Sequence, residues 1–411
     1  MNLIIDNEKG FDINVIKTKK FRTIKIELVF LKKTTEKEKL CGELLEMILD
    51  ESSKKYQNRE LIHIERENNF SPTITTNHSL RGDKSFFEVA MTFLSEKHLY
   101  KGHNQKCLDF FFELFLNPDI ENGQFNQRVF DMVSKKLKFQ IESLKENAVR
   151  YSINKAEQIT NLPIIYREQS LSILEKITPA DLANYYYKMI NDWFLEISIV
   201  GDIDQKVIEL VKARFNKRKR KMIPALKYEN KSIFKEKIEK GHYSQSELVM
   251  IAIVEDVTME EKFIIGSLFN QIFGASPNSK LFLEIREKKS YCYSVRSYYS
   301  RVLNVIIIRS GIGKENYHSV KELIIKQLID MQAGRFSNEV FKESKKDILK
   351  DFYMNQESQS RIININFFEK YELFFKLEKA IQVVKEATKQ DIVNFASKIK
   401  MRTIFFLEGE K

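Results

Sequence analysis

The chain has 411 residues, of which 43% are hydrophobic and 30% are charged, and its formal net charge is +11. This length exceeds one ordinary core, so we expect two or more domains. No apolar run approaches 18 residues and an acid already stands at Asp6, which argues against a membrane span and a secretory signal peptide. We therefore expect a cytoplasmic protein that has no membrane partner.

The positive charge is spread along the chain and interleaved with acidic residues. Only residues 217–221, KRKRK, form a dense basic run. A nucleic-acid-binding protein more often gathers its charge in a recognisable module, so we interpret this run as part of a solvated linker and expect no nucleic-acid partner. The cysteines Cys41, Cys107 and Cys292 form no CxxC pair, which indicates buried thiols in a reducing compartment.

Two similar series of elements follow one another along the chain. Period-two and apolar runs predict strands at residues 13–16, 22–30, 194–200, 247–254 and 402–407. Helical spacing predicts helices that include residues 107–116 and 339–355. Thr178 and Thr388 are each followed three residues later by an acid, which is typical of a helix N-terminus. We predict two α+β domains, residues 1–215 and 242–411, joined by a linker at 216–241.

The stretch from Asn278 to Ser297, NSKLFLEIREKKSYCYSVRS, reads as a helix followed by a strand. Its second part predicts a strand in which Tyr291, Tyr293 and Val295 alternate with Cys292, Ser294 and Arg296. Arg286 and Tyr293 then flank the junction, where a guanidinium and a phenol can both donate hydrogen bonds to one anionic oxygen. The alternative is an ordinary surface arginine and sheet tyrosine.

This stretch resembles the segment K/R-L-F-x-x-I/V-R-E-K-x-G-L-A-Y-S-V of pitrilysin/insulinase-family zinc peptidases, which include the mitochondrial processing peptidases. In that family the Arg and the Tyr contact the substrate carbonyl, and they correspond to Arg286 and Tyr293. This chain has Ser290, Tyr291 and Cys292 where the family usually has Gly-Leu-Ala. The resemblance implies two α+β halves that face each other like a clamshell around a peptide. It also implies that each half is a mainly antiparallel sheet with helices packed on one face.

The family's zinc motif, H-x-x-E-H, is absent from this sequence. Residues 52–56, SSKKY, resemble the family's G-T-K-K-Y and align the motif with residues 43–47, ELLEM. Glu43 and Met47 replace both histidine ligands, whereas Glu46 stands at the position of the general base. The third ligand aligns with Gln140, or in a second register with Glu142. No two histidines form an i, i+4 pair, and we expect His98 and His103 in an exposed loop, so the resemblance implies no metal site in this chain.

The chain keeps one part of the family's apparatus and lacks the other. Our leading hypothesis is a non-catalytic subunit of a heterodimeric peptidase, which binds the peptide substrate in an interdomain cleft and supplies Arg286 and Tyr293. A homologous partner subunit would then carry the zinc. The alternative is a peptide- or protein-binding structural homologue with no protease role. An independently active hydrolase is disfavoured because no nucleophile and base are placed together in a recognisable pattern.

Overall fold

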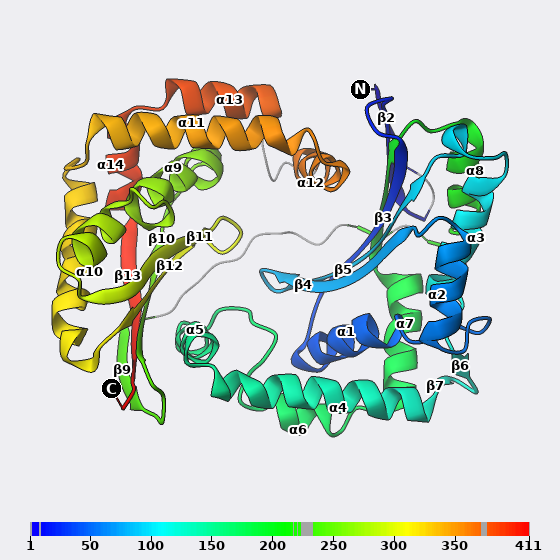
Figure 1. Ribbon diagram of the computed structural model, residues 1–411, viewed down its shortest axis with the longest axis horizontal. Coiled ribbons are helices and arrows are strands. Elements are labelled where there is room, and N and C mark those ends of the chain that lie inside the picture. Colours follow the sequence, from blue (N-terminus) through cyan, green and yellow to red (C-terminus); the bar gives the residue numbers. More distant parts are fainter. Residues whose placement is uncertain are drawn as a thin grey trace. The chain divides into compact units, whose positions relative to one another are not determined.

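The computed structural model describes residues 2–7, 10–216, 218–219, 221–222, 233–370 and 376–410. The chain divides into two compact units (Figure 1). The first comprises Met1–Ile141, Ile165–Leu226 and Gln359–Ile363, and the second comprises Glu142–Ile164, Lys227–Ser358 and Asn364–Lys411. Each unit therefore incorporates a short segment from the other half of the sequence.

Part of the predicted linker at 216–241 lies outside the described residues, namely 217, 220 and 223–232. Its last residues form strand β9 (Lys235–Lys240), which belongs to the sheet of the second unit. Among the described residues, no helix is both long and apolar enough to cross a membrane.

The first unit contains a six-stranded sheet in which β2 and β8 pair in parallel and all other neighbours are antiparallel. From edge to edge the strands are β1 (Asn2–Asn7), β2 (Asp12–Lys17), β8 (Phe194–Gly201), β3 (Thr23–Lys33), β5 (Lys84–Leu94) and β4 (Thr73–Arg81). β4 is thus an edge strand. The strands predicted near residues 13, 22 and 194 are confirmed.

Helices of the first unit cover one face of this sheet, where β3 contributes Ile26, Leu28 and Phe30 to the core. The helices are α1 (Glu36–Ile48), α2 (Arg59–Asn68), α3 (His103–Leu116), α4 (Gln127–Ser143), α6 (Ser170–Leu174), α7 (Pro179–Asp192) and α8 (Gln205–Ala213). A short hairpin, β6 (Ile120–Glu121) and β7 (Gln124–Phe125), precedes α4. The exposed loop expected around His103 is wrong, because His103 is buried at the start of α3 among Phe70, Phe93 and Tyr100.

The second unit contains a five-stranded sheet that is antiparallel except for the parallel β13–β9 pair. From edge to edge its strands are β11 (Cys292–Ser300), β12 (Val305–Ile312), β10 (Ser246–Val254), β13 (Ile399–Glu408) and β9. Its helices include α5 (Ala148–Ile159), α9 (Gly266–Asn270), α10 (Tyr317–Gln332), α11 (Asn338–Asn355), α13 (Leu377–Glu386) and α14 (Lys389–Ser397). Helix α12 (Gln359–Lys370) contributes residues to both units.

Strand β10 is buried on both faces, which explains its apolar run from Leu248 to Val254. Leu248 and Met250 pack into the larger core beneath the helices, whereas Val249 and Ile251 pack against α5 on the opposite face. The predicted two-sheet α+β fold is confirmed. The helix entries at Thr178 and Thr388 are confirmed as well, and both are reciprocal capping boxes. All three cysteines are buried, as predicted, and burial raises the pKa of the Cys41 and Cys107 thiols to about 12.

Candidate functional site

Arg286 lies on η5 (Phe282–Glu287), the last helical turns before strand β11. The chain then folds back on the end of this helix. The amide of Ser290 donates to the Arg286 carbonyl at 3.0 Å, and the amide of Tyr291 donates to the Ile285 carbonyl at 3.1 Å. Ser290 takes a positive φ of 54°, which is the kind of position where the family has glycine. The predicted helix-to-strand junction is therefore present and held by backbone hydrogen bonds.

A β-bulge at the start of β11 sets the direction of Tyr293. Cys292 pairs with Ile312 on β12, but the next pair is Ser294 with Gly311, so Tyr293 is an extra residue on its strand. The predicted alternation is wrong at this point, because Cys292 and Val295 are both buried whereas Tyr293 is 73% exposed. Without the bulge, period two would place Tyr293 on the same face as Val295, in the core.

The structure leaves both donors of the predicted pair available. The Arg286 side chain is exposed, and its guanidinium carbon lies 4.9 Å from the centre of the Phe282 ring. Within the described part of the chain, neither Arg286 nor the Tyr293 hydroxyl has a side-chain hydrogen bond, and the two side chains are not bonded to each other. The arrangement presents a cation and a hydroxyl donor on one short segment, beside an edge strand of the sheet.

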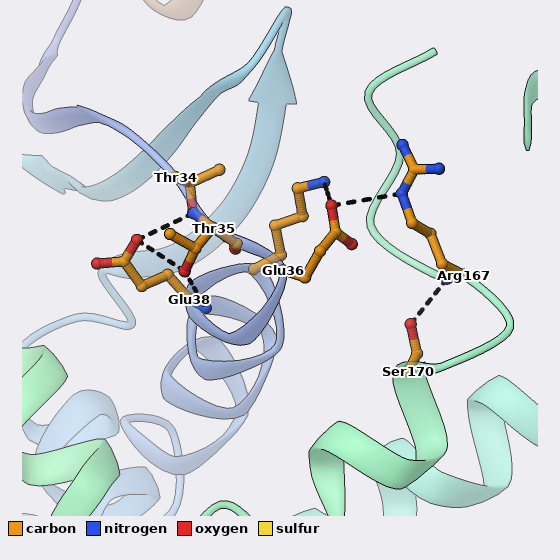
Figure 2. A network of polar contacts seen from close by, with 7 residues as sticks. Thr34, Thr35, Glu36, Glu38, Arg167 and Ser170 are labelled. Carbon is orange, nitrogen blue, oxygen red and sulfur yellow. Dashed lines mark hydrogen bonds and ion pairs between the residues drawn. The ribbon is translucent and has the colours of Figure 1, made fainter. Parts of the chain in front are cut away.

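The positions that correspond to the zinc motif lie in the middle of α1 in the first unit. Thr35 caps this helix by accepting a hydrogen bond from the amide of Glu38, and the Glu38 carboxylate accepts from the amide of Thr35 (Figure 2). Glu36 forms an ion pair of 3.3 Å with Arg167, whose amide donates to the Ser170 hydroxyl (Figure 2). These contacts dock the segment before α6 along α1.

A histidine from the neighbouring strand contacts both glutamates of the degenerate motif. His78 on β4 has no exposed side-chain surface, and its Nδ1 lies 2.7 Å from the Glu43 carboxylate. Its Nε2 lies 2.6 Å from the Ser85 hydroxyl, and its backbone amide donates to Glu46 at 2.8 Å. The Tyr166 hydroxyl donates to the second oxygen of Glu43 at 2.7 Å. We call Glu43, Glu46, His78, Ser85 and Tyr166 the α1 polar network.

Two acidic groups of this network, Glu46 and Tyr166, hold their protons more tightly than usual. Burial raises the pKa of Glu46, and the nearby charge of Glu43 adds to this rise. Burial and the charge of Glu43 also raise the pKa of Tyr166, so its hydroxyl stays protonated and acts as a donor. One oxygen of Glu43 accepts a hydrogen bond from the Tyr166 hydroxyl, and the other lies at hydrogen-bond distance from Nδ1 of His78.

Zinc sites use His, Cys or carboxylate ligands that converge on the ion. The residues at the motif positions do not fit this requirement. Glu43 and His78 are at direct hydrogen-bond distance, Glu46 is engaged by a backbone amide, and Met47 offers only a thioether. Across the described residues, no group of three or more His, Cys, Asp or Glu side chains is placed to hold a metal ion.

The order Ser85, His78, Glu43 repeats the hydrogen-bond sequence of a serine-hydrolase triad. A nucleophile must nevertheless reach its substrate, and Ser85 and the His78 side chain are fully buried. The network therefore serves packing and hydrogen bonding rather than nucleophilic attack. Gln140, at the position expected for the third zinc ligand, is exposed on α4. The described side-chain contacts of Glu43 go to His78 and Tyr166 and not to Gln140.

Sequence reasoning missed His78, Ser85 and Tyr166 as members of this site. His78 follows Glu43 by 35 residues and Tyr166 follows it by 123. The sequence offers only a weak local signal, a histidine in β4 and a serine at the start of β5. Single polar residues of this kind are common in strands and do not by themselves indicate a site. Only the pairing of β4 with β5, which sets His78 opposite Phe87 and near Ser85, brings the residues together.

Comparisons with known proteins show which sequences and structures this chain is similar to. Residues 176–348 match a family model described as "Peptidase M16 inactive domain". The chain is 21% identical over 418 residues to the "Probable inactive metalloprotease YmfF" of Bacillus subtilis (strain 168), covering 100% of this chain and 98% of that protein. A conserved protein from Enterococcus faecalis V583 has a similar crystal structure, with a TM-score of 0.92, 22% identity and coverage of 100% and 99%. Pitrilysin matches with a TM-score of 0.72 and 11% identity, over 98% of this chain and 42% of pitrilysin.

The fold and the degenerate motif define a metallopeptidase-like protein without the usual zinc ligands. Residues 176–348 match the model of the M16 inactive domain, and the whole chain is similar to an inactive metalloprotease of Bacillus subtilis. The likeness to pitrilysin is one of fold. The chain has Glu43 and Met47 at the two histidine positions of the zinc motif.

Proposed function

We propose that the chain is the zinc-less subunit of a heterodimeric pitrilysin-type metallopeptidase. It binds an extended peptide in the cleft between its two domains, residues 1–215 and 242–411, in the cytoplasm. Its homologous partner carries the zinc and delivers the attacking hydroxide. Arg286 and Tyr293 donate hydrogen bonds to the oxyanion that forms on the peptide carbonyl.

The observation that carries this proposal is that, among the described residues, neither the Arg286 guanidinium nor the Tyr293 hydroxyl has a side-chain hydrogen bond. A bulge costs ladder hydrogen bonds, and bulges often re-aim a side chain next to a functional site. Here the bulge takes a large aromatic residue out of the core, and its hydroxyl has no hydrogen-bond acceptor among the residues that the structure describes. A purely structural tyrosine at this position would be expected to pack or to bond internally.

Because β11 is an edge strand, the same segment can also pair with peptide backbone. Backbone pairing gives affinity with little demand on the peptide sequence. The formal charge of +11 favours acidic or neutral peptides, although a charge spread this widely steers them only weakly.

The test is peptide hydrolysis by the chain reconstituted with an H-x-x-E-H homologue from the same cell. Arg286→Ala and Tyr293→Phe should each lower kcat by about a hundredfold or more, because each removes a donor that acts mainly on the transition state. KM and the amount of heterodimer recovered by gel filtration should change little. Steady-state hydrolysis of one fluorogenic peptide, chosen from a library by its cleavage, provides both constants.

Two neighbouring exposed residues provide matched controls. Lys289→Ala removes a cation three residues from Arg286, and Tyr298→Phe removes a hydroxyl from a tyrosine that is 63% exposed further along β11. Neither change should alter kcat. Hydrolysis that is insensitive to Arg286→Ala and Tyr293→Phe would instead support the alternative, a peptide- or protein-binding homologue with no protease role.

A further inference from the structure

Helix α2 of the first unit covers a cavity that the proposed peptidase role does not use. The cavity has a volume of ≈ 350 Å³. Pockets that hold small molecules have volumes of about 300–1,000 Å³, so this one suits a compact ligand. Its floor is apolar and is formed by Leu49, Ile74, Val89, Phe111, Leu114 and Phe115.

The helix that covers this floor is unusual because it has no buried residue. Arg59, His63 and Arg66 lie at i, i+4 and i+7, on one face of α2, and all three line the cavity together with Ile62. A surface helix ordinarily directs its apolar stripe toward the core. Here a basic stripe faces an apolar floor, and closure of the cavity would desolvate two guanidinium groups.

Arg59 and Arg66 differ in whether a carboxylate pairs with the guanidinium. Arg59 forms an ion pair of 2.8 Å with Glu51, and Asp50 lies beside it at the same end of the cavity. Arg66 donates to Nδ1 of His63 at 3.2 Å, and the Glu67 carboxylate lies 3.8 Å from the same nitrogen. Among the described residues, no carboxylate forms an ion pair with Arg66 itself. Arg66 therefore supplies the positive charge of the site.

We propose that this cavity binds a monocarboxylate with an apolar body. The apolar part packs on the floor between Ile74 and Phe111, and the carboxylate accepts hydrogen bonds from the fork of Arg66. Two sources share this chemistry, a free fatty acid of medium length and the C-terminal residue of a peptide. The site is independent of the proposed subunit role, because every lining residue lies in the first unit.

The test uses calorimetric titration of the full chain with octanoate, N-acetyl-phenylalanine and their neutral counterparts, 1-octanol and N-acetyl-phenylalanine amide. At least one carboxylate should bind, and about ten- to hundredfold more tightly than its neutral counterpart, because a hydrogen bond to a charged group contributes that much affinity. Tighter binding of octanoate identifies a free acid as the ligand, and tighter binding of N-acetyl-phenylalanine identifies a peptide C-terminus.

Two variants and two controls test the location of the site. Arg66→Gln should weaken carboxylate binding at least about tenfold while binding of the neutral probes is unchanged. Ile62→Trp should abolish binding by filling the cavity. Arg128→Gln, at an exposed arginine of the same unit, and Leu61→Trp, on the outer side of α2, should bind like the parent chain.

Equal affinity for acid and neutral probes would overturn the proposal, as would full binding by Arg66→Gln or Ile62→Trp. Absence of binding by all four probes would overturn it as well. Ligand-free unfolding curves check that each variant is folded, so that a loss of binding by a folded variant reports on the site.

Discussion

Single residues of the α1 polar network show how a degenerate metal site can be filled by side chains. Glu43 stands where a zinc-binding histidine is found in the family, and it accepts hydrogen bonds from His78 and Tyr166. A buried carboxylate is stable only when its oxygens have partners. The imidazole of His78 supplies one of these partners and fills space next to α1, so it is the residue on which the network depends.

Replacement of His78 by alanine should lower the free energy of unfolding by about 2–4 kcal/mol. The change leaves Glu43 and Ser85 without a shared partner and opens a cavity beside α1. Urea unfolding followed by circular dichroism measures the difference. His98→Ala, at an exposed histidine of the same unit, should change stability by less than about 0.5 kcal/mol. Equal effects of the two substitutions would refute a central role for His78.

The raised pKa of Glu46 predicts a specific pH dependence. Burial makes the folded state bind the Glu46 proton more tightly than the unfolded state does, so this group lowers stability as pH rises from about 4.5 through the raised folded pKa. Glu46→Gln removes this titration but keeps an acceptor for the His78 amide. The variant should be more stable than the parent chain at pH 8, and the difference should shrink toward pH 4. Glu60→Gln, at an exposed carboxyl, should show no such trend.

At the scale of elements, α1 and β4 pack more closely than a helix and a strand usually do, because α1 has a glycine at the contact. A Cβ atom added at Gly42 would lie 2.4 Å from Nε2 of His78. Two capping contacts at the helix start and the Arg167–Glu36 ion pair then hold the rest of the helix in place (Figure 2). The network is therefore built from a helix, the edge strand β4, its neighbour β5 and a docked loop.

Gly42→Ala should destabilise the protein, although alanine is the better helix former by about 1 kcal/mol. The methyl group clashes with a buried ring that has no free space to move, and this cost exceeds the gain in helix propensity. The double variant Gly42→Ala/His78→Ala should be less destabilised than the sum of the single changes, because the second change removes the clash. Strict additivity in a double-mutant cycle would show that the ring and the glycine are not coupled.

At the scale of the whole molecule, sequence order and structural unit do not coincide. The segment Glu142–Ile164 lies in the first half of the sequence but belongs to the second unit. Helix α5 within this segment covers Val249, Ile251 and Phe405. The Thr160 hydroxyl donates a hydrogen bond to the Thr403 hydroxyl at 2.7 Å. Removal of this segment would expose an apolar face of a sheet.

A fragment of residues 242–411 should therefore fail to unfold cooperatively and should bind a hydrophobic dye. It lacks both α5 and β9, so one face and one edge of its sheet lose their cover. Fusion of residues 142–164 to the fragment should reduce dye binding, and a scrambled version of that segment should not. Cooperative unfolding of the unfused fragment, without dye binding, would contradict this assignment.

The sequence alone determined the elements and the class of protein. Apolar runs and capping residues such as Thr178 act over a few neighbouring positions, so strands, helix starts and the α+β class could be predicted locally. The segment around Arg286 carried the family resemblance for the same reason.

Only the tertiary structure decided the orientation of Tyr293, the burial of His103 and the α1 polar network. A bulge depends on how two strands pair, and a histidine enters a network only when strand register sets it against a helix. His78 and Tyr166 lie far from Glu43 in sequence, and their hydrogen bonds form through packing that no local pattern records. The cavity beneath α2 likewise results from how one helix rests on a core, which spacing within that helix cannot specify.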